Sequence, residues 1–471
     1  MRWIVLLLVS IVLALSFYAY DSLSPIKETI QVHLQFSSTD YGLLVSVYSI
    51  PNTILFMVIL GGIFSDRWGI RKTGLAAALA CVLGALITAY GASDLFVRGG
   101  FGHTFLSSFL PRFSAPLKMM VLGRLFFGLG AETLNIVVLK ILVKWFKGRK
   151  MAFAFSLMTI IARMGTAAVL ILSPVLIEAK TGWATSLWVS AVLMLLGFLL
   201  LLVYLSLDRR YPEASKETVD DFRGRDIVAL LKNRSFLFIC LLCVMFYSAF
   251  FPFLSFLPDL LHNKFQLSLR LSGALSSLMI WGTIVFIPIV GWFVDNKGKI
   301  ASLLLYGSGM LFFSHLVLAK TSLTPYLAIV VLGLAFTLVP AALWPAVPRI
   351  VDEKRVGTAY GIMTWTQSLG ILAFPYLAGR ITDLSNPGVR LEQVQSGQAF
   401  LNYTNTSLMF AGLGILSFLF ALLLKREDSG KSGFRLQLPE KRIKPDPSAD
   451  RLSGVPEERS AHADQGPANG S

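Results

Sequence analysis

The sequence predicts an all-α integral membrane protein whose twelve transmembrane helices form two pseudo-symmetric six-helix bundles. Of the 471 residues, 55% are hydrophobic and only 15% are charged, whereas soluble domains carry about 25% charged residues. Apolar runs of about 20 residues, the length that crosses a bilayer core about 30 Å thick, recur from the first residues to about residue 425. A similar short loop follows the second and the eighth run, which indicates an internal repeat.

Polar segments separate the predicted spans along the chain. The twelve spans lie near residues 3–20, 41–62, 74–93, 119–142, 151–177, 184–206, 236–258, 271–294, 300–319, 325–348, 357–381 and 405–425. The charged stretch between the sixth and the seventh span cannot lie in lipid. We therefore predict an N-terminal bundle at 1–206, a cytoplasmic linker at 207–235, a C-terminal bundle at 236–425 and a disordered cytoplasmic tail at 426–471.

Basic residues indicate the orientation in the membrane. The short loops RWGIRK (67–72), KWFKGRK (144–150) and EKR (353–355) fall on the same side as both chain ends, so the positive-inside rule places the two termini in the cytoplasm. The net charge of +15 reflects this topology and favours anionic lipid headgroups. We expect no nucleic-acid partner, because the basic residues are spread over separate loops rather than gathered in one patch.

Metal and cofactor chemistry has no support in the sequence. Cys240 and Cys243 form a lone C-x-x-C inside an apolar span, where small buried residues pack, and the five histidines do not cluster. No nucleotide-binding loop or nucleophilic triad is recognisable. We therefore expect no enzyme, no metal and no cofactor.

A loop of the form G-x-x-x-D-R-x-G-x-R-K, in GGIFSDRWGIRK (61–72), lies between the second and third spans. A weaker copy, GWFVDNKGK (291–299), lies between the eighth and ninth spans. Its glycines allow close packing and a tight turn, and its aspartate can pair with basic residues or lie at a helix N-terminus. We expect both loops to act in conformational change. Their key residues are Gly62, Asp66, Arg67, Gly69, Arg71 and Lys72 in the first loop and Gly291, Asp295 and Gly298 in the second.

Two charged residues of opposite sign are predicted near the middle of the membrane. Glu132 lies about 13 residues from the outer end of the fourth span and Arg163 about 12 residues from the inner end of the fifth, at about 1.5 Å per residue. A charge at this depth costs several kcal/mol unless it is paired or faces water. Glu132 and Arg163 can each bind one end of a zwitterion, or they can form a structural ion pair that never touches a substrate.

Further charges have more than one interpretation. Arg124 lies about 12 Å from Glu132 along the same helix and either contributes to the cavity or pairs with Asp21, and we favour a structural role. Lys140, nearer the cytoplasm, can extend its ammonium group to the surface. Spans seven to ten are predicted to lack buried acids and bases. Only Glu132 and Asp21 are then available for proton coupling, which favours uniport.

Several motifs resemble a known superfamily. The two loops, the six-plus-six layout, the central linker and GRLFFGLGA (123–131) resemble the major facilitator superfamily. SFYAYDSLSPIKETIQ (16–31), GLGAETL (128–134) and FYSAFFPF (246–253) further resemble the vertebrate lysosomal dipeptide uniporter family. The resemblance implies the major facilitator fold and facilitated movement of dipeptides. It also implies that Glu132 and Arg163 hold the amine and the carboxylate of the peptide.

The resemblance suggests further substrate-binding residues by position. They are Tyr18, Tyr20, Tyr247, Trp344 and Gln367. Each of the aromatic residues can instead be a packing residue. Trp344 lies between Pro340 and Pro345, where a kinked helix could form a gate. Trp365 and Ser368 differ from the vertebrate family, so the side-chain preference can differ as well.

Together these observations predict a monomeric dipeptide uniporter that works by alternating access in a lipid bilayer. Two alternatives stay open. One is a major facilitator transporter, by uniport or proton symport, of an amino acid, an organic anion or a sugar, and the other is a membrane receptor that transports nothing. The first span begins almost at Met1 and leaves no room for a sorting extension. We therefore expect a bacterial cytoplasmic membrane, or a lysosomal membrane if the source is eukaryotic.

Overall fold

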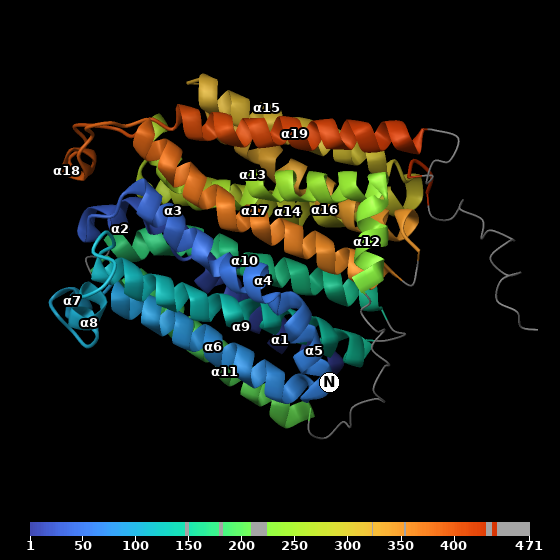
Figure 1. The fold of residues 1–471 in the computed structure, drawn as a ribbon, viewed down its shortest axis with the longest axis horizontal. Helices are drawn as coiled ribbons and strands as arrows, with labels where there is room; N and C mark the ends of the chain where they lie inside the picture. The colour runs from blue at the N-terminus through green and yellow to red at the C-terminus, as the bar shows by residue number, and fades with distance from the viewer. Residues whose placement is uncertain are drawn as a thin grey trace, which may run out of the picture.

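The computed structural model describes residues 1–146, 150–178, 182–208, 224–322, 324–352, 355–429 and 436–439. Long helices run side by side along one axis, and the described residues contain no strand (Figure 1). The N-terminus and α12 lie at one end of the bundle, which we call the terminal face. Four short helices lie at the opposite end, the loop face: α2 (Lys27–Leu34), α7 (Asp94–Val97), α8 (His103–Ser107) and α18 (Leu391–Gln395).

Helices occupy every predicted span. The first half contains α1 (Arg2–Asp21), α3 (Ser38–Ser46), α4 (Ile50–Leu55), α5 (Met57–Arg67), α6 (Gly69–Gly91), α9 (Ala115–Phe146), α10 (Met151–Glu178) and α11 (Thr185–Asp208). The second half contains α13 (Arg234–Phe265), α14 (Leu269–Lys297), α15 (Ile300–Lys320), α16 (Tyr326–Ile350), α17 (Val356–Leu384) and α19 (Thr404–Asp428). Short 3₁₀ turns are η1 (Ser24–Ile26) and η2 (Val47–Ser49).

Not all of these helices are equally apolar. Within the described ranges, ten helices are long and apolar enough to cross a membrane, and eleven if one bent pair counts as a single span. The eleventh predicted span, 357–381, is α17, which is not among them, although it packs in the bundle against α3 and α13. Its Thr, Ser and Gln residues lower its mean hydropathy.

The second predicted span is broken rather than continuous. Its two parts, α3–α4 and α5, meet at an angle of 59°. The break is at Phe56, which has left-handed backbone angles (φ 53°, ψ 42°). The Asn52 side-chain oxygen accepts a hydrogen bond of 3.0 Å from the Val58 N–H, so a donor left unpaired by the break is satisfied from the preceding turn.

The two halves pack most closely near the loop face, where α3 meets α17 and α10 meets α14. A Cβ atom added at Gly42 would lie 2.3 Å from the Pro375 carbonyl oxygen, and one at Gly379 would lie 2.0 Å from the Ser38 carbonyl oxygen. Only glycine permits such close approach of two helix backbones. These positions therefore fix how tightly the halves close.

The first loop motif makes its contacts within the first half. Gly69 has φ +82° and forms the turn before α6. Asp66 pairs with the Lys140 ammonium group at 2.5 Å, so Lys140 is held in an ion pair rather than extended freely to the surface. Arg71 pairs with Asp208 at 3.0 Å. Arg67 and Lys72 are exposed.

The prediction of close packing at the motif glycines is wrong for two of them. A Cβ atom at Gly62 or at Gly291 would meet no atom within 4 Å, whereas one at Gly61 would lie 3.0 Å from the Thr133 hydroxyl. Asp295 of the second loop is exposed. Gly298 has φ +70° and its backbone lies directly against Leu438.

This contact corrects the expectation of a tail disordered from residue 426. Helix α19 continues to Asp428, and Leu436 is fully buried. The Ile300 N–H donates to the Leu436 carbonyl at 3.0 Å, and Arg349 donates to the Leu438 carbonyl at 2.8 Å. The predicted linker also contains a helix, α12 (Gly224–Lys232). Residues 209–223 and 440–471 lie outside the described part of the chain.

We predict that Gly42→Ala lowers the melting temperature of the purified protein, because the added methyl group would overlap the Pro375 carbonyl. Overpacking of this kind costs about 1–3 kcal/mol. The matched control is Gly412→Ala in α19, where a Cβ would meet no atom within 4 Å and alanine favours the helix. Equal melting temperatures for the two variants would contradict close packing of α3 on α17.

Candidate functional site

Arg163 of α10 lies between the two halves and is surrounded by aromatic rings. Its guanidinium carbon lies 4.9 Å from the ring centre of Phe17, 5.3 Å from that of Phe251 and 5.4 Å from that of Phe336. Phe17 belongs to α1, whereas Phe251 and Phe336 belong to α13 and α16 of the other half. Arg163 forms no ion pair with any carboxylate of the described chain. The rings stabilise the positive charge and leave its donors free for another anion.

Glu132 of α9 is partly buried and has a tyrosine partner rather than a basic one. Its Oε1 atom accepts a hydrogen bond of 2.8 Å from the Tyr48 hydroxyl. The Tyr48 ring packs edge-on against that of Tyr20, with ring centres 4.5 Å apart. Glu132 takes part in no ion pair between described residues. The structural Glu132–Arg163 ion pair considered from the sequence is therefore not formed in this conformation.

Arg124 of α9 is buried beside these tyrosines. Its Nη1 atom donates to the Tyr20 carbonyl at 3.2 Å, and its guanidinium carbon lies 5.5 Å from the ring centres of both Tyr20 and Tyr48. The predicted alternative of an Arg124–Asp21 pair is not found, because Asp21 instead accepts a hydrogen bond of 2.6 Å from Thr166. Arg124 thus binds the backbone of Tyr20 and packs on the ring of Tyr48, whose hydroxyl donates to Glu132.

Tyr20 of α1 lies in this charged region. Its ring packs on that of Tyr48, which donates to Glu132, and the Arg124 guanidinium carbon lies 5.5 Å from its ring centre. The arrangement brings charges of both signs to one region of the first half, without pairing Glu132 with Arg163.

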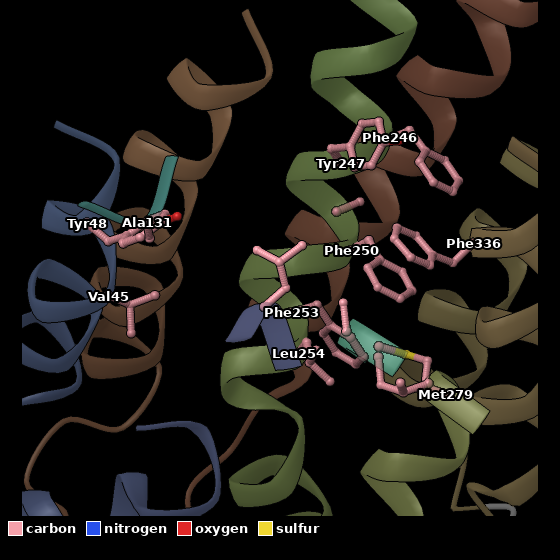
Figure 2. Packing of buried hydrophobic residues seen from close by; sticks show 14 of the residues in the cluster. Val45, Tyr48, Ala131, Phe246, Tyr247, Phe250, Phe253, Leu254, Met279 and Phe336 are labelled. Carbon is pink, nitrogen blue, oxygen red and sulfur yellow. The ribbon is translucent and has the colours of Figure 1, made fainter. Parts of the chain in front are cut away.

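The second half contributes an aromatic wall. Figure 2 shows Tyr247 and Phe250 of α13 beside Phe336 of α16. The rings of Phe250 and Phe336 are stacked with centres 3.7 Å apart. The Trp344 indole N–H donates to the Tyr247 hydroxyl at 3.1 Å, and the Tyr360 hydroxyl donates to the Trp344 carbonyl at 3.1 Å. Tyr247 and Trp344 are therefore held in fixed positions.

The remaining predicted residues lie elsewhere. Tyr18 is 2% exposed and packs in the main core, and its buried hydroxyl group has no hydrogen-bond partner among the described residues. Gln367 is partly buried and makes no side-chain hydrogen bond to the described residues. The Trp365 indole N–H donates to the Thr53 carbonyl at 2.9 Å, and Ser368 accepts a hydrogen bond from Asn52. Trp365 and Ser368 therefore join α17 to α4.

A buried ion pair joins the halves at the loop face. The Lys27 ammonium lies 2.7 Å from Asp259 Oδ2, and the two side chains are 0% and 2% exposed. Lys27 also donates to Gln31, and Tyr403 donates to Asp259. The prediction that spans seven to ten lack buried acids and bases is therefore wrong, because α13 carries Asp259 and α15 carries the fully buried His315.

Further contacts close the loop face. Asp383 of α17 accepts hydrogen bonds of 2.9 and 2.8 Å from the backbone N–H groups of Ser38 and Thr39 at the start of α3. The Tyr41 hydroxyl donates to the Ser255 carbonyl at 2.9 Å. At the terminal face, by contrast, the ion pairs between described residues each join side chains of a single half. The protein is thus sealed at the loop face.

Comparison with known proteins places this geometry in a family. The model of the Major Facilitator Superfamily matches residues 9–375. The chain is 30% identical to the lysosomal dipeptide transporter MFSD1 of Mus musculus over 383 residues, which cover 78% of this chain and 77% of that protein.

Solved structures share the fold. A variant of the nucleoside transporter NupG superposes with a TM-score of 0.70 at 16% identity, covering 89% of this chain and 99% of that one. A bacterial homologue of the human lysosomal transporter Spinster superposes with a TM-score of 0.67 at 14% identity, covering 90% and 97%.

We predict that Asp259→Ala or Lys27→Ala alone destabilises the protein, because each leaves a buried charge without its partner, at a cost of about 3–5 kcal/mol. The double variant Lys27→Met/Asp259→Leu replaces both charges by apolar groups and should melt closer to the wild type. Thermal unfolding of the four proteins compares the intact pair, each unpaired charge and the apolar replacement. Single variants that melt like the wild type would show that the pair does not hold the halves together.

Proposed function

The chain belongs to the major facilitator superfamily and is a multi-pass transmembrane transporter, and on this premise we propose that it is a facilitative dipeptide uniporter. The observation that carries the proposal is the separation of Glu132 from Arg163. Both side chains are partly buried and both belong to the first half. Neither has an oppositely charged partner among the described residues. An unpaired charge inside a membrane protein marks a functional site, because it is costly to keep.

A dipeptide fits the two unpaired charges. Its amine is a donor for the Glu132 carboxylate, beside the Tyr48 hydroxyl, and its carboxylate is an acceptor for the Arg163 guanidinium in the ring cage. In a single amino acid the two charged groups flank one carbon atom. In an extended dipeptide they are about 7 Å apart, at about 3.3–3.6 Å per residue, which better matches two groups that do not reach each other.

The second half can supply the surface for the peptide side chains. Phe251, Phe336 and Tyr247 form an apolar wall opposite the charges, and Phe251 and Phe336 also contact Arg163. Such a wall accommodates varied side chains through packing rather than through specific hydrogen bonds. We therefore propose a preference for neutral dipeptides with apolar side chains.

Transport requires the loop face to open while the terminal face closes. We propose that this change separates Lys27 from Asp259 and releases Asp383 from the start of α3. The basic loops of the terminal face support a cytoplasmic location for that face. We propose the cytoplasmic membrane of a bacterium, or the lysosomal membrane of a eukaryote, as the location, and a monomer as the working unit.

The decisive experiment is counterflow uptake of a labelled neutral dipeptide into proteoliposomes, with and without a proton gradient. We expect uptake by the wild type that does not depend on the gradient. Glu132→Gln and Arg163→Ala should each reduce uptake at least about tenfold, since hydrogen bonds to charged groups contribute about 1.5–3 kcal/mol.

Two controls match these changes in chemistry but lie on the exposed surface: Glu392→Gln on α18 and Arg380→Ala on α17. Both should transport like the wild type. If folded wild type takes up no dipeptide but does take up an amino acid or an organic anion in the same vesicles, the superfamily assignment stands and the dipeptide proposal is wrong.

Blocked peptides test which charge holds which end. An N-acetylated dipeptide should inhibit uptake of the labelled dipeptide by the wild type only weakly. It should inhibit uptake by Glu132→Gln as well as the free dipeptide does. A dipeptide amide should show the same pattern with Arg163→Ala. If each variant instead loses discrimination at the opposite end, the peptide binds in the reverse direction.

We predict a smaller effect for Tyr48→Phe, which removes only the hydroxyl that donates to Glu132. The substrate feels this loss only through the position of Glu132, so the KM for a dipeptide with a free amine should rise about three- to tenfold, where tenfold corresponds to about 1.4 kcal/mol. The inhibition constant of the N-acetylated dipeptide should not change. An equal loss for both peptides would indicate a general packing defect rather than positioning of Glu132.

A further inference from the structure

The chain between α6 and α9, residues 92–114, forms an ordered excursion at the loop face. It contains α7 and α8, which lie beside the ends of α6 and α9 at the edge of the bundle (Figure 1). A small core of its own, separate from the main core, holds it together: Phe96, Leu106 and Ala115 are buried, with Tyr90 and Met119 packed against them. The excursion is therefore a folded platform.

Large apolar side chains project outward from this platform. Phe101 is 92% exposed, Leu95 and Phe105 are each 70% exposed, and Leu110 is 60% exposed. An exposed apolar patch on an ordered segment marks an interaction surface, because each exposed apolar Å² costs about 25 cal/mol in water. The core beneath the patch has its own apolar residues, so these four are not needed to fold the excursion.

Basic residues surround the patch. Arg98 and Arg112 are exposed and form no ion pair within the described chain. The Lys118 ammonium lies 4.8 Å from the ring centre of Phe109. Asp94 is the one acidic residue between positions 92 and 114. Aromatic residues next to arginine and lysine are typical of segments that lie in the headgroup region of a bilayer.

The position of the excursion fixes its height relative to the membrane. Helices α6 and α9 are both long and apolar enough to span a bilayer. The excursion begins directly after Gly91 at the end of α6 and ends directly before Ala115 at the start of α9. The patch is thus tethered at both ends to the membrane surface. By contrast, α18 and the residue after it at the same face expose polar side chains, those of Glu392, Gln393 and Ser396.

We propose that the excursion binds the bilayer surface, with Phe101, Phe105 and their apolar neighbours inserted among the lipids and with Arg98 and Arg112 on anionic headgroups. The chemistry favours lipid over a protein partner because the patch combines insertion-competent aromatic rings with unpaired basic groups. This contact anchors α6 and α9 of the first half to one leaflet.

The test uses full-length protein in lipid nanodiscs with an environment-sensitive fluorophore at Phe105→Cys. The three native cysteines are buried and do not compete for the label. The matched control is Ser396→Cys, an exposed position directly after α18 at the same face. We expect blue-shifted emission at position 105, quenching by nitroxide-bearing lipids, and a larger effect with anionic lipid that is lost in Arg98→Ser/Arg112→Ser. The control label should show none of these changes.

Two results would overturn the proposal. Emission at position 105 that matches the control in both neutral and anionic nanodiscs would show that the patch stays in water. A blue shift without quenching by lipid nitroxides, appearing only as protein concentration rises in detergent, would show that a second copy of the chain covers the patch instead of lipid.

Discussion

The cost of holding a charge inside a bilayer shapes the whole centre of this protein. Arg163, Glu132 and Arg124 lie on helices that cross the membrane, and each is stabilised in a different way: Arg163 by aromatic rings, Glu132 by the Tyr48 hydroxyl, and Arg124 by backbone carbonyls and rings. None of the three is neutralised by an opposite charge among the described residues. Neighbouring aromatic residues therefore replace counter-ions, and two charges stay available to a ligand.

At the loop face, buried charges are stabilised by an ion pair instead of by aromatic rings. There Lys27 and Asp259 neutralise each other across the two halves and are shielded from water. The contrast separates two uses of buried charge. A closed pair joins the two halves, whereas charges without a partner are open to a ligand, the role that we propose for Glu132 and Arg163. Both uses depend on α1 and the segment that follows it, since Tyr20 and Lys27 are only seven residues apart.

The sequence predicted the helices well but not the contacts between them. Apolar runs gave every long helix, and the depth of Glu132 and Arg163 singled them out, because both signals are local. The break at Phe56, the role of Tyr48 and the Lys27–Asp259 pair depend on which helices meet. No local pattern marks these features. Asp259 follows an apolar run directly, and a charged residue at that place is usually explained by exposure at the membrane surface. Tyr48 lies seven residues after the cross-half contact residue Tyr41, which is the only hint of its inward face.

The left-handed residue in the second span has a mechanical consequence. Phenylalanine in this conformation is less stable by about 1–2 kcal/mol than phenylalanine in a right-handed helix. The backbone energy at Phe56 therefore favours a continuous helix over the bent one. Asn52 restrains it by binding Val58 beyond the bend and Ser368 of α17 at once. A single amide thus ties the shape of one helix to the position of the opposite half. A movement of α17 away from the first half would break the Asn52–Ser368 hydrogen bond and allow the second span to straighten.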